Sequence, residues 1–173
     1  MKPGSEYSGN KRQRATKGSI IQLHVNGYYY YGQILIMGNC SFFDYRSTTP
    51  LEDLWILLER PVLFTICVYR DVISSGCWPK VGKLPIRDDL LPLKMKYIHH
   101  DYGSLEFELY NPNTGEVFPS SKEECRGLEC CAIWDQNHVE DRLSDYYSGA
   151  PCIWLEKDRT LFQDIDGNTV LHP

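Results

Sequence analysis

Several common sequence signatures are missing from this chain of 173 residues, and each absence excludes a class of protein. No apolar run reaches the roughly 18 residues that a membrane-spanning helix needs. The N-terminal segment MKPGSEYSGNKRQR lacks the apolar stretch of a secretory signal, so we expect a cytoplasmic protein. No Cys-x-x-Cys, His-Glu-x-x-His, Gly-x-Ser-x-Gly or phosphate-binding glycine motif occurs. The usual signatures of zinc, hydrolase and nucleotide sites are therefore absent.

The cysteines do not form a disulfide framework that can be recognised from their spacing. There are seven, an odd number, and most lie in apolar segments such as VLFTICVY and LECCAIW. In a reducing compartment they are best interpreted as small buried hydrophobic residues. Cys125, Cys130, Cys131 and His138 do not have the paired spacing of zinc ligands. We expect no metal site and no cofactor.

Charge is distributed unevenly along the chain. The net charge is −5, but residues 1–87 carry 11 cations and 6 carboxylates, whereas residues 88–173 carry 7 and 17. Such acidity either keeps the protein soluble or complements a basic protein partner. We single out seven carboxylates as candidate partner-binding residues: Glu123, Glu124, Glu129, Asp135, Glu140, Asp141 and Asp145.

A row of four tyrosines follows the pair Asn26 and Gly27. Asn-Gly between two β-favouring runs predicts a hairpin with a two-residue turn, because both turn positions need positive φ. The predicted pairs are Ile21 with Gly32, Leu23 with Tyr30, and Val25 with Tyr28. Because side chains alternate between faces, Tyr29 and Tyr31 lie among polar neighbours on the second face. They are either cross-strand packing on a hydrated face or an aromatic contact surface.

The remaining patterns predict a mostly β (α+β) fold, with a strongly twisted antiparallel sheet or partial barrel and two or three short helices. Residues 1–17 are expected to be a flexible arm and residues 18–173 a single β-rich domain. CWPKVGKLP is expected to be an irregular loop. Helices are predicted in TTPLEDLWILLER (capped by Thr49, with Pro50 at the first position), DVISSG and DQNHVEDRLSDYYSG. Strands are predicted in CSFFDY, RPVLFTICVYRD, LKMKYIHHDY, SLEFELYNPNTGEVF (a hairpin), LECCAIWD and the C-terminal PCIWLEKDRTLFQDIDGNTVLHP.

The best catalytic candidate is the sequence His-His-Asp at residues 99–101. In a strand, His99 and Asp101 point to the same side, where a carboxylate can orient an imidazole as a general base. No nucleophile is identifiable by spacing, so a polar cluster at the end of a strand is the favoured interpretation.

Three segments in this order resemble the immunity protein 26 family: KGSIIQLHVNGYYYYGQIL, RPVLFTICVYRDVISSGCWPKVGKLP and YGSLEFELYNPNTGE. The resemblance covers roughly residues 17–135. It implies a mostly β protein that binds and neutralises a toxin domain of a bacterial polymorphic-toxin or contact-dependent inhibition system. It supplies no catalytic residues, and WPKVG, the most specific match, is expected to be structural, with Trp78 capping the core.

The predicted function is therefore neutralisation of a cognate toxin C-terminal domain, a nuclease, whose active site the acidic surface occludes. Tyr29 and Tyr31 are a second candidate contact. The competing hypotheses are a nucleic-acid-binding β-barrel that uses the basic arm and these tyrosines, a small hydrolase or lyase that uses His99 and Asp101, and a scaffold protein without a toxin partner.

Overall fold

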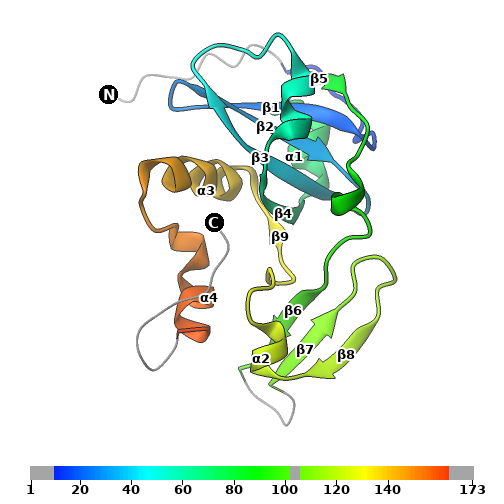
Figure 1. Cartoon of the computed structure of the whole chain (residues 1–173), viewed down its shortest axis with the longest axis vertical. Coiled ribbons are helices and arrows are strands. Elements are labelled where there is room, and N and C mark those ends of the chain that lie inside the picture. Colours follow the sequence, from blue (N-terminus) through cyan, green and yellow to red (C-terminus); the bar gives the residue numbers. More distant parts are fainter. Residues whose placement is uncertain (1–9, 102–105, 164–173) are drawn as a thin grey trace.

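The computed structural model describes residues 10–101 and 106–163, and in these residues the chain forms two sheets (Figure 1). The fold is mostly β with short helices, as predicted, and the described strands do not close into a barrel. The first sheet has six strands in the order β5-β1-β2-β3-β4-β9. Their bounds are Lys80–Lys83, Ser19–Val25, Tyr28–Ile34, Asn39–Ser47, Val62–Val68 and Ile133–Trp134.

The β1–β2 hairpin has the predicted turn and the predicted register. Asn26 and Gly27 have φ values of 50° and 81°, the left-handed conformation that this turn requires. Leu23 lies opposite Tyr30 and Val25 opposite Tyr28. The hairpin therefore fixes which side chains of β1 and β2 face each side of the sheet.

Both faces of the first sheet are buried. On one face, Leu23 and Tyr30 pack with residues of β3, β4, α1 (Arg70–Ser74) and α3 (Gln136–Ser148). On the other face, Tyr31 packs with Phe43 and Leu57 under the 3₁₀ segment Leu54–Glu59. The prediction of a hydrated second face is wrong at Tyr31, which is 0% exposed. A segment distant in sequence covers this face, so strand alternation alone did not reveal its burial.

The second sheet is a three-stranded antiparallel meander of β6 (Lys96–His99), β7 (Phe107–Tyr110) and β8 (Val117–Ser120). It lies at the opposite end of the molecule from β5 (Figure 1). The outer edge of β6 is covered, because the Tyr97 N–H donates to the carbonyl of Glu129 at 3.0 Å and the Tyr97 carbonyl accepts from the Cys131 N–H at 2.8 Å. Inside the molecule, the ammonium of Lys96 donates to the side-chain oxygen of Asn39 in β3 at 3.0 Å. These contacts join the second sheet to the first.

The helices differ from the predictions at several positions. The first is a 3₁₀ helix, Leu54–Glu59, capped by Asp53 rather than by Thr49. Helices α1 and α3 form where helices were predicted, and a short α2 (Lys122–Cys125) was not predicted. In the C-terminal region, where strands were predicted, the chain forms a 3₁₀ turn (Ile153–Leu155) and α4 (Glu156–Leu161). The remainder of that predicted strand region, residues 164–173, lies outside the described part. Within the described residues, no helix combines the length and the apolar character needed to cross a bilayer.

Two segments have a different extent from the prediction. The expected loop CWPKVGKLP contains β5, which pairs with β1. The expected buried strand LECCAIWD contains only Ile133–Trp134, which adds to β4 in parallel.

All seven cysteines are free thiols, but Cys131 is exposed and only Cys40, Cys125 and Cys152 are buried.

Part of the predicted N-terminal arm is attached to the domain. Residues 1–9 are outside the described part, but Gln13 donates from its side chain to the carbonyl of Trp78 at 2.6 Å and from its backbone to Ser74 at 3.1 Å. Gly76 lies directly beneath Lys11 at φ 78°, where a Cβ atom would overlap the Lys11 carbonyl oxygen. The arm therefore packs on the loop after α1 from Lys11 onward.

We expect Gly76→Ala to destabilise the protein more than Gly115→Ala. Both glycines have φ near 80°, which costs an alanine about 1–2 kcal/mol. A Cβ at Gly115 meets nothing within 4 Å, whereas at Gly76 the backbone of Lys11 must move, which adds about 1–3 kcal/mol. Urea unfolding of the two variants measures the difference. Equal losses of stability would contradict the packing of Lys11 on this loop.

Candidate protein-binding surface

Helix α3 positions most of the candidate carboxylates. It begins after Asp135 and ends at Gly149, whose φ of 71° terminates the helix. Val139 and Leu143 are fully buried against the first sheet, and this stripe fixes the rotation of the helix. Figure 1 shows α3 lying beside the strands of the first sheet, with the chain turning after α3 and running down toward α4.

Glu129 holds α3 in place and is not free to meet a partner. Both of its oxygens accept hydrogen bonds from the guanidinium of Arg142, at 2.6 and 3.1 Å. Arg142 is 2% exposed, and its guanidinium lies 3.9 Å from the ring centre of Phe64 and 5.0 Å from that of Trp134. A buried guanidinium needs a compensating carboxylate. Glu129 was predicted to belong to an acidic surface, but in the structure it neutralises Arg142 inside the protein.

Glu140 is likewise engaged inside the protein. One of its oxygens accepts from the indole N–H of Trp78 and from the side chain of Gln136, each at 2.9 Å. Trp78 is buried and meets Phe42 edge-on, so it has the structural role predicted for WPKVG. The Glu140 carboxylate therefore links α3 to Trp78, which lies just before β5 in the chain.

Glu123 and Glu124 are exposed but have local partners on α2. Two hydrogen bonds from Arg126, at 2.9 and 3.0 Å, hold the pKa of Glu123 below its usual value. Glu124 closes a capping box with Ser121, and hydrogen bonds from Ser120 and Ser121 lower its pKa too. Both carboxylates stay ionised at neutral pH, but their local hydrogen bonds restrict the side chains that a partner would contact.

Asp135, Asp141 and Asp145 remain as the carboxylates most available on α3. Trp154 lies beside them: its ring stacks on His138 with centres 3.6 Å apart, and its indole N–H donates to Asp141 at 2.9 Å. Ile153 and Trp154 are 65% and 41% exposed. We call the following set the α3 flank: His138, Asp141, Asp145, Ile153 and Trp154. Its apolar part was not predicted, because the segment PCIWL was expected to be a strand.

The tyrosine candidates do not form a surface. Tyr31 is buried, and its hydroxyl donates to the side-chain oxygen Oε1 of Gln22 at 3.1 Å and accepts from the Leu51 N–H at 2.7 Å. Tyr29 is half-buried and stacks on His24 with ring centres 4.3 Å apart. Only Tyr29 therefore has area left for a partner.

The candidate catalytic pair is close together, as predicted. His99 Nδ1 is 3.5 Å from an Asp101 oxygen, and the His99 ring packs on Phe107. The neighbouring His100 meets Glu108 at 2.7 Å. These contacts fit a polar cluster at the end of β6. Among residues 10–101 and 106–163, no three His, Cys, Asp or Glu side chains gather as metal ligands would.

Comparison with known proteins supplies the family. A β-rich molecule that exposes aromatic and acidic side chains next to one another has the character of a binding protein. Residues 17–107 match the family model of immunity protein 26. The chain belongs to this family, which supports the role of an immunity protein that binds a toxin protein and suggests a non-enzymatic inhibitor. No curated protein and no solved structure matches the chain.

We expect Glu129→Ala to cost about 3–5 kcal/mol of folding stability, because it removes the carboxylate that accepts two hydrogen bonds from the buried Arg142. Glu123→Ala is the matched control, because the Glu123 side chain is exposed and its partner Arg126 can be solvated. Its unfolding midpoint in urea is expected to stay close to that of the unmodified protein. Similar midpoints for both variants would contradict the structural role of Glu129.

Proposed function

We propose that this immunity protein neutralises its toxin by pressing the α3 flank against a cationic surface of the toxin domain. The supporting observation is the exposed Trp154 and Ile153 beside Asp141 and Asp145. Tryptophan is the side chain most often found to dominate binding energy at protein interfaces. Carboxylates around it select a basic partner and speed its approach.

A nuclease is the toxin class that this chemistry favours. An enzyme that binds nucleic acid presents cations where phosphates lie, and the carboxylates of α3 and its N-terminal Asp135 offer the same sign of charge. Binding there would cover the active site and exclude the nucleic acid. The encounter would take place in the cytoplasm, with the toxin C-terminal domain encoded beside the immunity gene.

The position of the α3 flank in the chain fits a role in specificity. The residues that match the family model end at 107, within β7, before α2 and α3 begin. The matched residues include most of the first sheet, which serves as the platform on which α3 rests. Discrimination between toxins would then come from side chains on the helix that this platform positions.

The nucleic-acid-binding hypothesis receives less support. It requires exposed tyrosines for base stacking, but Tyr31 has no exposed area and Tyr29 is covered on one side by His24. The hypothesis also takes its cations from a flexible N-terminal arm, but this arm packs on the domain through Lys11 and Gln13.

The test uses the toxin domain encoded immediately upstream as the probe. Asp145→Lys should slow association at low salt by about tenfold, because it reverses a charge on the contact surface. Trp154→Ala should raise the dissociation rate by about tenfold or more. Surface plasmon resonance at two salt concentrations separates the effects, and co-expression measures rescue of cell growth.

Glu59→Lys is the matched control, since it makes the same charge change at an exposed residue of the 3₁₀ helix on the opposite face of the sheet. Its association rate should equal that of the unmodified protein. Tight binding that neither Asp145→Lys nor Trp154→Ala weakens would contradict the α3 flank as the toxin-binding surface and would leave the immunity role intact. No binding by the unmodified protein would count against the proposed partner itself.

A further inference from the structure

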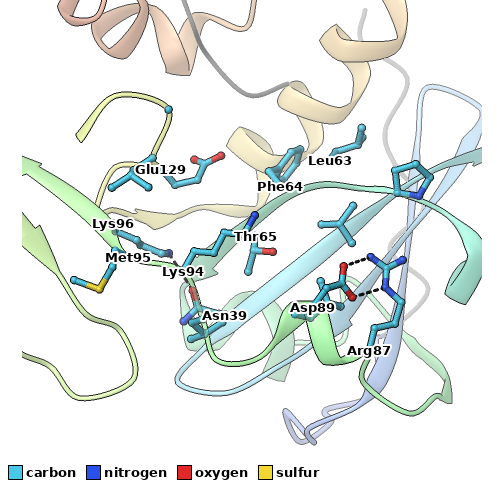
Figure 2. A pocket seen from close by; sticks show the side chains of 16 residues that line it. Asn39, Leu63, Phe64, Thr65, Arg87, Asp89, Lys94, Met95, Lys96 and Glu129 are labelled. Atoms are coloured by element: carbon cyan, nitrogen blue, oxygen red, sulfur yellow. Dashed lines mark hydrogen bonds and ion pairs between the residues drawn. The ribbon is translucent and has the colours of Figure 1, made fainter. Parts of the chain in front are cut away.

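A cleft of about 380 Å³ lies between β4 of the first sheet and the segments that hold Lys96 and Glu129 (Figure 2). This volume is in the range of small-molecule sites. Apolar side chains make up much of its lining, and we call the following set the apolar wall: Val62, Leu63, Leu90, Leu93 and Leu128. The polar end is formed by Asn39, Thr65, Lys94 and Lys96, which Figure 2 shows gathered together.

Lys96 is the unusual residue of this cleft. Its side chain is buried, with the residue 5% exposed, and burial lowers the pKa of the ammonium. An ammonium carries three donors, and within residues 10–101 and 106–163 its one protein acceptor is the Asn39 oxygen at 3.0 Å. Two N–H donors are therefore available to an acceptor that enters the cleft.

The two carboxylates that line the cleft form no ion pair with Lys96, since each is hydrogen-bonded by an arginine, although the charge of Glu129 favours the ammonium form of Lys96. Asp89 accepts two hydrogen bonds from Arg87, at 2.7 and 2.9 Å, and Figure 2 shows this pair at the opposite end of the cleft. Glu129 accepts two from Arg142. Once these pairs are set aside, Lys94 and Lys96 leave a net positive charge at the polar end of the cleft, in a chain whose net charge is −5.

We propose that this cleft is a binding site for a small carboxylate with a short apolar body. The carboxylate would accept hydrogen bonds from the free N–H donors of Lys96 and lie near Lys94, and the apolar body would rest on Leu90 and Leu93. The charge-assisted bond replaces lost hydration of the buried ammonium, and the leucines lose contact with water. The site is separate from the α3 flank and does not rest on the proposed toxin contact.

Hexanoate is the probe, and its neutral isostere hexanamide is the matched control ligand. We expect hexanoate to shift the backbone amide resonances of Thr65, Leu93 and Lys96 in the full chain, with saturation at a dissociation constant of about 1 mM or lower. Hexanamide should bind at least about tenfold more weakly, because it lacks the charge that Lys96 recognises. Inorganic phosphate, an anion without an apolar body, should also bind more weakly.

Lys96→Met keeps the apolar stem and removes the charge, and it should weaken hexanoate binding about tenfold or more. If that variant does not fold, Lys94→Gln is the second test, because Lys94 is exposed and its loss leaves the sheet contacts intact. It should weaken hexanoate binding severalfold, because it removes a positive charge that lines the cleft. Lys157→Gln on α4 is the matched control and should bind as the unmodified chain does.

Three results would overturn the proposal: no saturable shifts in the cleft by about 10 mM hexanoate, equal affinity for hexanamide, or unchanged binding in the folded lysine variants. Equal affinity for phosphate would show that the cleft is a general anion site and would refute the role of the apolar wall.

Discussion

The buried ion pair between Arg142 and Glu129 is the interaction on which the arrangement of this molecule depends. Arg142 lies in the middle of α3, over aromatic rings of β4 and β9, and Glu129 belongs to the strand-like segment beside β6. A single guanidinium thus joins the helix, the first sheet and the edge of the second. Because a buried charge is stable only with its partner, the pair holds α3 at the position where Val139 and Leu143 fix its rotation.

That position determines what α3 presents to solvent. With Val139 and Leu143 turned toward the sheet, His138, Asp141 and Asp145 lie together on one side of the helix, and Trp154 packs along them. The acidic C-terminal half of the chain is therefore divided in two. Some carboxylates stabilise the fold from within, and a smaller group gives the exposed flank its charge. Acidity in the sequence alone does not distinguish the two groups.

The parts of the fold that depend on neighbouring residues were predictable from sequence. The Asn26–Gly27 turn fixed the hairpin register through its φ requirements, and the apolar spacing of Val139 and Leu143 with Gly149 fixed α3. Features set by distant partners were not predictable. Tyr31 is buried because residues 54–59 cross the sheet, and Glu129 is internal because Arg142, 13 residues away, reaches it. Ile153 and Trp154 suit a strand by propensity, but they lie in a 3₁₀ turn in which Trp154 packs on His138 of α3.

Hydrogen–deuterium exchange of the immunity protein, alone and bound to its toxin domain, tests the central claim most directly, because it reports every amide at once without substitution. The account predicts new protection in residues 136–148 and 153–155, with β8 (Val117–Ser120) at the other end of the molecule unchanged. Protection confined to β8 or to the β1–β2 hairpin, with α3 exchanging as it does in the free protein, would contradict it.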